Sequence, residues 1–161
     1  MTDEFLYCPF CSPESGREII LENELCYCVY DKYPVSTGHA LIIPKRHCAE
    51  YFKLTSEEQT ACWEMVNEIK GILDNEYHPD GFNIGINVNE AAGQTIPHVH
   101  IHLIPRYEGD VAEPEGGIRG VIPNKRAYKI KIDENILGKA SVSKESKTPE
   151  LSNQPLTFLY S

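Results

Sequence analysis

Apolar and polar residues recur with two different periods along the chain. Short runs rich in β-branched and aromatic residues predict strands at residues 17–22, 25–31, 39–43, 82–88 and 98–104. Residues 55–75 predict a helix, because apolar side chains recur there every three or four positions and Thr55-Ser56-Glu57-Glu58 forms a capping box. Since strands outnumber helices and the connections are short, we expect an α+β domain: an antiparallel sheet of about five strands with one long helix.

Composition narrows the classes of protein to which this chain can belong. Its 161 residues are enough for one domain, which we assign to residues 1–137, and the polar residues 138–161 are expected to form a C-terminal tail. Subtracting 24 Asp and Glu from 15 Lys and Arg gives a net charge of −9, which argues against a nucleic-acid partner. No apolar run approaches the roughly 20 residues of a membrane span. Because residues 1–5 are acidic and lack the apolar stretch of a signal peptide, we expect a cytoplasmic protein with reduced cysteines.

The segment His98-Val99-His100-Ile101-His102-Leu103-Ile104 concentrates three of the six histidines. In a strand, alternate side chains share a face, so the apolar residues would enter the core and the histidines would line the opposite face. This pattern has three interpretations: a half-buried strand whose polar face carries histidines, a catalytic metal site, or nucleophilic catalysis by a neutral imidazole. The residues alone leave these interpretations open.

A second candidate site is Cys8-Pro9-Phe10-Cys11 near the N-terminus. In a reducing compartment, two cysteines at this spacing indicate metal binding or redox chemistry. No strand-helix-strand pattern follows the motif, so a thioredoxin-like redox site is the weaker interpretation.

The histidine segment resembles the signature of the histidine triad family of nucleotide hydrolases and transferases. The loop at residues 90–95 before it and Pro105-Arg106 after it resemble the fragile-histidine-triad branch, and residues 30–47 resemble the upstream half of the family domain. The resemblance covers roughly residues 5–108. It implies a nucleotide substrate, a histidine triad fold and a homodimer whose sheets join side by side.

The resemblance also implies catalytic roles for four residues. His100 would be the nucleophile that attacks the α-phosphate and forms a nucleotidyl-imidazole intermediate. His102 would contact the phosphate oxygens or protonate the leaving group, and His39 would lie beside the catalytic histidine. Gln94 would support the leaving phosphate and orient water. The alternatives are a core histidine for His39 and a loop residue bonded to nearby backbone for Gln94.

Four further residues are expected to bind the substrate on the same grounds. Asp31 would accept hydrogen bonds from ribose hydroxyls, with a turn cap as the alternative. Asn87 would face the phosphate, or else serve as a turn residue at a strand end. Arg106 and Lys45 would steer polyphosphate into an otherwise acidic protein, or else be solvated surface charges.

The resemblance further implies a structural zinc ion. Cys8 and Cys11 would complete a Cys₂His₂ site with His47 and His98, the first histidine of the triad. Four protein ligands would close the coordination sphere. The alternative is a loop dithiol without metal.

The function we expect from these observations is hydrolysis of dinucleoside polyphosphates, such as diadenosine tetraphosphate, at the α-phosphate through a covalent nucleotidyl-histidine. His102 stands where the uridylyltransferase branch has Gln, which favours hydrolysis over transfer. Alternatives are a hydrolase of nucleoside phosphoramidates or adenylylated amines, a nucleotide sensor or adaptor with little turnover, and a hydrolase with a His-ligated catalytic zinc. Residues 111–137 are assigned no role.

Overall fold

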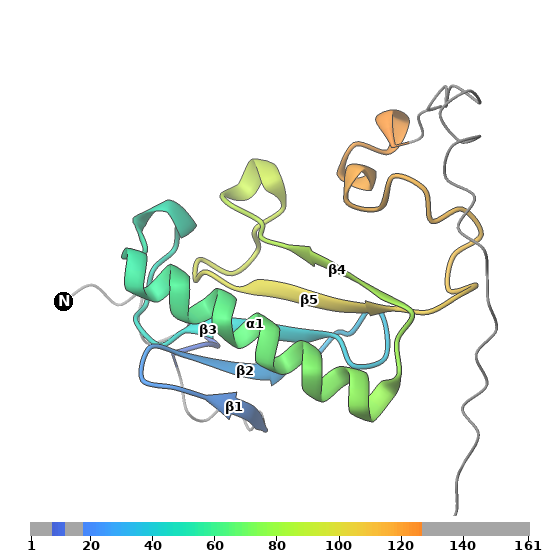
Figure 1. The fold of residues 1–161 in the computed structure, drawn as a ribbon. Coiled ribbons are helices and arrows are strands. Elements are labelled where there is room, and N and C mark those ends of the chain that lie inside the picture. Colours follow the sequence, from blue (N-terminus) through green and yellow to red (C-terminus); the bar gives the residue numbers. More distant parts are fainter. Residues whose placement is uncertain (1–7, 12–17, 127–161) are drawn as a thin grey trace, which may run out of the picture. The chain divides into compact units, whose positions relative to one another are not determined.

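The computed structural model describes residues 8–11 and 18–126 of the chain (Figure 1). The expected tail at residues 138–161 and its boundary with the domain lie outside this part. Within the described residues, no helix combines the length and the apolar character that crossing a membrane requires.

The described strands form one antiparallel sheet in the order β1-β2-β3-β5-β4, which confirms the expected fold class (Figure 1). They are β1 (Ile19–Glu22), β2 (Cys26–Tyr30), β3 (Ala40–Pro44), β4 (Gly81–Gly85) and β5 (Ile101–Arg106). β5 lies between β3 and β4, so Leu41 and Gly85 both lie opposite His102. Pairing on both sides therefore fixes the position of His102.

The long helix α1 (Ser56–Tyr77) crosses one face of the sheet (Figure 1). The buried residues of the core between them are Cys26, Cys28, Ala40, Ile42, Cys62, Met65, Val66, Ile69, Leu73, Ile101 and Leu103. Because Ile101 and Leu103 point toward α1, His102 between them points to the opposite face, which we call the histidine face. The connections carry short 3-10 helices: η3 (Tyr51–Lys53), η4 (Glu90–Ala92), η5 (Gly117–Val121) and η6 (Pro123–Lys125).

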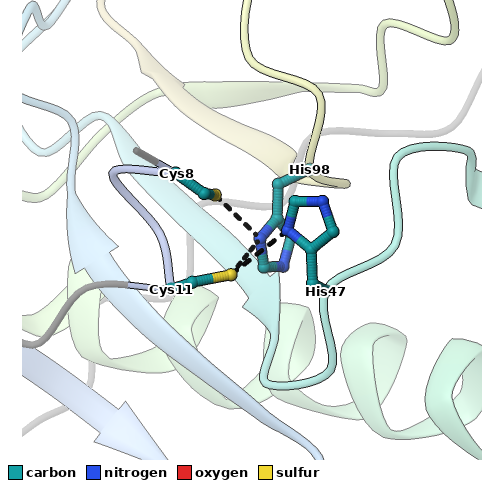
Figure 2. Close-up of side chains that lie close together, drawn as sticks. All are labelled: Cys8, Cys11, His47 and His98. Carbon is teal, nitrogen blue, oxygen red and sulfur yellow. Dashed lines mark hydrogen bonds between the residues drawn. The ribbon is translucent and has the colours of Figure 1, made fainter. Parts of the chain in front are cut away.

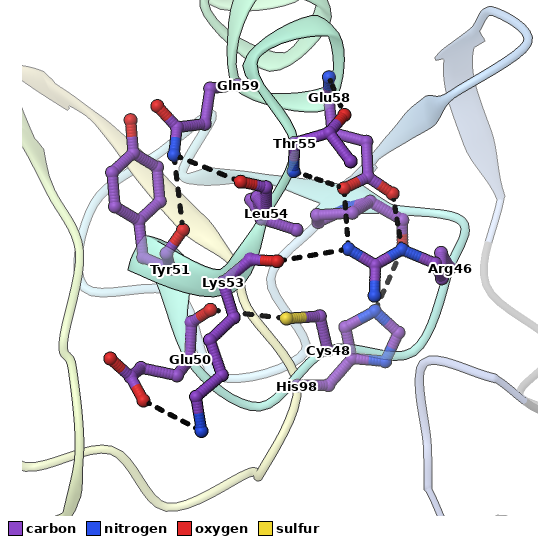
Figure 3. A network of polar contacts seen from close by, with 11 residues as sticks. Arg46, Cys48, Glu50, Tyr51, Lys53, Leu54, Thr55, Glu58, Gln59 and His98 are labelled. Carbon is purple, nitrogen blue, oxygen red and sulfur yellow. Dashed lines mark hydrogen bonds and ion pairs between the residues drawn. The ribbon is translucent and has the colours of Figure 1, made fainter.

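The start of α1 is held by the predicted capping box, to which a neighbouring arginine is added (Figure 3). Glu58 N–H donates to Thr55 Oγ1 at 3.2 Å, and Thr55 N–H donates to Glu58 Oε2 at 2.8 Å. Arg46, two residues after β3, donates to both carboxylate oxygens of Glu58 at 2.7 Å. Glu58 is only 5% exposed, so this bidentate pair ties the end of β3 to the helix N-terminus.

The predicted strand over residues 98–104 is wrong at its start. β5 begins at Ile101, because the preceding backbone bonds to a loop outside the sheet: Val99 N–H donates to Cys48 O at 2.7 Å. Val99 is still buried, but beside Cys48 and Leu54 rather than in the core under α1. His98 and His100 therefore lie in an irregular segment that leads into the strand.

The predicted end of the same strand at Pro105 is also wrong, since β5 continues to Arg106. The carbonyl of Pro105 accepts a hydrogen bond from Ser36 Oγ at 2.7 Å, on the side where β3 no longer pairs. The missing N–H of Pro105 therefore breaks no ladder bond. β4 ends three residues earlier than predicted, which leaves Asn87 in the following connection. The predicted bounds of β1, β2, β3 and α1 agree with the structure to within two residues.

Replacing Glu58 tests the link between β3 and α1. The hydrogen bonds from Arg46 lower the pKa of Glu58 below its ordinary value of 4.5, so the carboxylate stabilises the fold above that pH, and this contribution is lost as the pH falls through the folded-state pKa. We expect Glu58→Gln to lower the free energy of unfolding by about 2 kcal/mol at pH 7. Urea unfolding at pH 7 and pH 3 measures the difference. The exposed helix variant Glu64→Gln is the control, and an equal loss at both pH values would contradict the assignment.

Candidate functional site

His98 joins the N-terminal loop to the end of β3 (Figure 2). Its fully buried ring has Nε2 2.8 Å from the carbonyl oxygen of Pro44, and because a carbonyl can only accept, Nε2 carries the proton. In the neutral ring, Nδ1 therefore carries no proton and has a lone pair available for bonding. This atom lies 3.4 Å from Sγ of both Cys8 and Cys11.

His47, on the loop after β3, completes this cluster (Figure 2). Its Nδ1 lies 3.2 Å from Sγ of Cys11, and the four possible ligand atoms all lie within 4.8 Å of one another. Tetrahedral zinc bonds of about 2.3 Å to sulfur and 2.0–2.1 Å to nitrogen put these atoms about 3.6 Å apart, close to the distances seen here. Burial raises the pKa of Cys11 to about 11, so a bound cation would have to displace its proton. The cluster is thus a candidate metal site.

His100 has a defined proton position as well. Its Nδ1 lies 2.8 Å from the backbone carbonyl oxygen of His98 and must donate to it, so the neutral ring carries its lone pair on Nε2. The ring is 6% exposed and packs against Phe10, with ring centroids 5.2 Å apart. The same residue, His98, therefore contributes its side chain to the metal cluster and its carbonyl to the orientation of His100.

A second chain of hydrogen bonds fixes His102. Nδ1 of His39, just before β3, accepts the Val35 N–H at 3.3 Å, which leaves the proton of the neutral ring on Nε2. That Nε2–H donates to His102 Nδ1 at 3.0 Å, so the proton of His102 lies on its own Nε2. Burial lowers the pKa of His39, and it lowers the pKa of His102 to about 4 with help from the neighbouring His100, so both rings are neutral at pH 7.

The two series of hydrogen bonds, one through His98 to His100 and one through His39 to His102, end at neighbouring rings. The ring centroids of His100 and His102 are 5.0 Å apart. His100 offers an unprotonated Nε2 and His102 a protonated Nε2, so the pair presents one nucleophile and one hydrogen-bond donor. This combination suits attack on an electrophile that carries oxygens, such as a phosphoryl group.

Of the predicted substrate-binding residues, Asp31 lies beside the ring of His39, which bonds to His102. Asp31, directly after β2, places Oδ2 3.6 Å from His39 Nδ1 and accepts the Tyr33 N–H on Oδ1 at 2.9 Å. Asn87 lies two residues beyond Gly85, which is opposite His102. Because β4 ends at Gly85 and β5 begins at Ile101, the sheet pairing does not extend to Asn87, and its contact with the phosphate stays a prediction.

Gln94 is engaged with backbone in this structure. Its Oε1 accepts the Asn89 N–H at 2.7 Å, and its Nε2 donates to the carbonyl oxygens of Ala49 at 2.7 Å and Ile96 at 3.1 Å. The amide thus holds the loop before the triad in place, as in the loop alternative. Its role on a phosphate stays a prediction.

The two predicted cations are paired within the protein and lie away from His100. Arg106 donates to Asp110 through two nitrogens at 2.6 and 2.7 Å and to Asn83 at 2.6 Å. It is four residues past His102 on β5, roughly 13 Å along the strand. Lys45 pairs with Glu22 at 2.7 Å. The structure brings neither cation to the histidine pair.

Sequence reasoning missed Phe10 as part of the site. The residue lies between the two cysteines, and its 6% exposed ring contacts both His98 and His100. Tyr27 Oη donates to the Phe10 carbonyl at 2.6 Å and holds the loop against β2. The only signal in the sequence was an aromatic residue inside a ligand motif, which does not say where the ring points.

Comparisons with known proteins identify relatives of this chain. The family model of the HIT domain matches residues 12–109, more than half of the chain. The chain is 38% identical over 93 residues to a bis(5′-adenosyl)-triphosphatase of Dictyostelium discoideum, and 32% identical over 107 residues to an AP-4-A phosphorylase of Mycobacterium tuberculosis. These matches cover 58% and 66% of this chain, and 62% and 54% of the lengths of the two relatives.

A solved structure extends the likeness to three dimensions. The crystal structure of a zinc-bound histidine triad family protein from Mycobacterium smegmatis is 33% identical, with a TM-score of 0.62, and the match covers 68% of this chain and 81% of that one. The histidine pair, its sheet and the family match together define the class of protein. This chain belongs to the HIT, or histidine triad, family.

The proton positions can be measured directly by ¹⁵N NMR of histidine-labelled protein. We expect the neutral ring of His100 to carry its proton on Nδ1 and the neutral ring of His102 to carry its proton on Nε2. His102 should stay neutral as the pH falls toward about 4, because burial disfavours the charged ring. The exposed His78 provides a reference signal within the same chain. The opposite proton positions on His100 and His102 would contradict the hydrogen-bond assignment.

Proposed function

We propose that this protein is a nucleotide hydrolase that cleaves dinucleoside polyphosphates at the α-phosphate, with His100 as the nucleophile. The observation that carries the proposal is the hydrogen bond from His100 Nδ1 to the His98 carbonyl, because it leaves Nε2 free and aimed away from the backbone. A neutral imidazole is a good nucleophile at pH 7 and a good leaving group once it is attached to phosphorus.

The proposed reaction has two steps. His100 Nε2 attacks the α-phosphorus, forming a P–N bond while the P–O bond to the leaving phosphates breaks. Water then attacks the same phosphorus, the P–N bond breaks, and the nucleoside monophosphate leaves with His100 restored. His102 Nε2–H donates to the phosphate oxygens, where negative charge develops. The second step returns the nucleophile to its starting form.

Asp31 and Asn87 would position the nucleotide in this reaction. The Asp31 carboxylate has capacity for ribose hydroxyls beyond its bond from Tyr33, because a carboxylate can accept about four hydrogen bonds. Asn87 would donate to the α-phosphate from the β4 side. The Dictyostelium triphosphatase and the mycobacterial AP-4-A phosphorylase, whose names give dinucleoside polyphosphates as substrates, support this substrate class.

The metal that we propose for the cysteine and histidine cluster is zinc, in a structural role. Two sulfur and two nitrogen donors fit tetrahedral zinc, and four protein ligands leave no position for a substrate. Bound zinc would fix the loop at residues 8–11 to His98, and so would keep Phe10 against His100. The zinc-bound relative from Mycobacterium smegmatis supports this assignment.

The homodimer implied by the family is part of the same proposal. β1 and β4 are the outer strands of the described sheet, and pairing through an outer strand would join two sheets side by side. Light scattering should give a mass of twice 18.2 kDa. A mass of one chain would contradict the dimer.

Replacing the nucleophile tests the reaction. We expect His100→Asn to lower the rate of diadenosine tetraphosphate cleavage by about 10⁴-fold or more, because the proposed intermediate forms on this imidazole. His78→Asn, at an exposed position after α1, should leave the rate unchanged. Chromatography of the products measures both rates.

The products also separate the alternative reactions. AMP with ATP indicates water as the acceptor, whereas ADP with ATP, formed only when inorganic phosphate is added, indicates phosphorolysis. Cleavage of adenosine 5′-phosphoramidate alone would support the phosphoramidate alternative. Tight binding without any product would support a sensor, and unchanged turnover in His100→Asn would refute the nucleophile.

Metal analysis tests the zinc proposal. We expect about one zinc per chain in the purified protein and none in Cys11→Ser, because loss of one thiolate opens a tetrahedral site. Cys48→Ser, whose sulfur donates to the Glu50 carbonyl and lies outside the ligand cluster, should retain the metal. Equal metal content in both variants would refute the ligand assignment.

A further inference from the structure

A cavity of about 520 Å³ lies on the histidine face, toward the end of β5 beyond His102. Its lining includes Ile104 and Asn83 from the sheet, Val35 from the β2–β3 loop, and Arg126 from the segment that follows the triad. Neither the family match, which ends at residue 109, nor the proposed reaction assigns it a role. Its volume is in the range of small-ligand sites.

The cavity adjoins the catalytic pair through two of its lining residues. Ile104 is two positions after His102 on β5, so both side chains lie on the same face of the sheet, roughly 7 Å apart. Val35 donates its N–H to His39, whose ring bonds to His102. A ligand that extends from the histidine pair along β5 would therefore enter this cavity.

Residues 116–126 form the opposite wall of the cavity, over β4. A β-carbon at Gly85, opposite His102, would lie 3.8 Å from Ile118 Cδ1, and one at Gly117 would lie 3.3 Å from Asn83 Nδ2. Ile118 thus packs over Gly85 next to His102, and Gly117 packs against Asn83, which closes the cavity on this side. Arg119 holds this wall together by donating to the backbone carbonyls of Lys125 and Arg126.

The chemistry of the lining fits a nucleoside with phosphates. The lining carries two arginines, Arg106 and Arg126, and one carboxylate, Asp110, which pairs with Arg106, so the lining is net positive in a chain of charge −9. Tyr107 and Ile104 add aromatic and aliphatic surface against which a base can pack. A cationic rim with an apolar wall suits the end of a substrate that carries both phosphate and base.

We propose that this cavity binds the departing half of a dinucleoside polyphosphate, namely the second nucleoside with its phosphates. The inference rests on the proposed function, and it adds a reason for preferring substrates with two nucleosides. The first nucleotide occupies the histidine pair and Asp31, and the second extends along β5 past Ile104 into the cavity. A substrate with a small leaving group leaves the cavity empty.

Filling the cavity tests this inference. Gly120 lines it, and a β-carbon there would make only an ordinary contact of 3.6 Å with Arg126 Cδ, so Gly120→Leu fits the backbone and occupies the space. We expect the KM for diadenosine tetraphosphate to rise about tenfold, with no change for adenosine 5′-phosphoramidate. Gly71→Leu, on α1 with no atom within 4 Å of the added carbon, is the matched control.

A second pair of variants tests the charge of the lining without filling it. Arg126→Ala should raise the KM for diadenosine tetraphosphate, and the neighbouring Lys125→Ala, which is outside the lining, should not. Equal effects on the two substrates, or no effect of either cavity variant, would overturn the inference. Thermal unfolding of each variant checks that the fold is intact.

Equilibrium binding separates this inference from the proposed reaction. In a His100→Asn background, Gly120→Leu should weaken the binding of diadenosine tetraphosphate about tenfold and leave the binding of AMP unchanged. That result together with no cleavage by the unaltered protein would refute the reaction but keep the cavity site. Cleavage by the unaltered protein with unweakened binding in Gly120→Leu would refute the cavity site but keep the reaction.

Discussion

The peptide unit and ring of His98 are the constraint on which the site depends. The ring donates to the Pro44 carbonyl at the end of β3, and its other nitrogen faces the two cysteines of the N-terminal loop. The carbonyl of the same residue accepts from His100 Nδ1. Residues distant in sequence are thus fixed around one point. A change in any of these contacts would alter the direction of the lone pair on His100.

Because the histidine rings are buried, these hydrogen bonds determine which nitrogen of each ring carries the proton. An exposed histidine exchanges its proton between two nitrogens and with water, whereas a buried neutral ring keeps the proton where a partner demands it. Two fixed chains, one through His98 and one through His39, leave an acceptor on His100 beside a donor on His102. In the proposed reaction the pair would therefore need little rearrangement when charge develops on a phosphate, which is how preorganised sites lower a barrier.

Patterns in the sequence predicted those features of the fold that depend on interactions between residues close together in the chain. The capping box and the apolar stripe predicted where α1 begins and which residues it buries. The alternation of apolar residues and histidines along β5 predicted that His102 lies on the face of the sheet opposite the core. Other features depend on contacts between distant segments. Val99 bonds to Cys48, so β5 begins later in the sequence than predicted. Arg106 pairs with Asp110 and Asn83 rather than lying at the histidine pair. Grouping Cys8 and Cys11 with two histidines required the resemblance to a family, because spacing alone does not say which distant residues meet.

The central claim is that the lone pair on His100 Nε2 becomes bonded to phosphorus, and trapping the intermediate tests it most directly. The protein is mixed with diadenosine tetraphosphate, quenched within one turnover, kept at alkaline pH to preserve the P–N bond, and digested for mass spectrometry. The account predicts an added adenylyl group on the peptide that contains His100, absent from the His100→Asn protein. Cleaved substrate with no adduct, or an adduct on another residue, would contradict it.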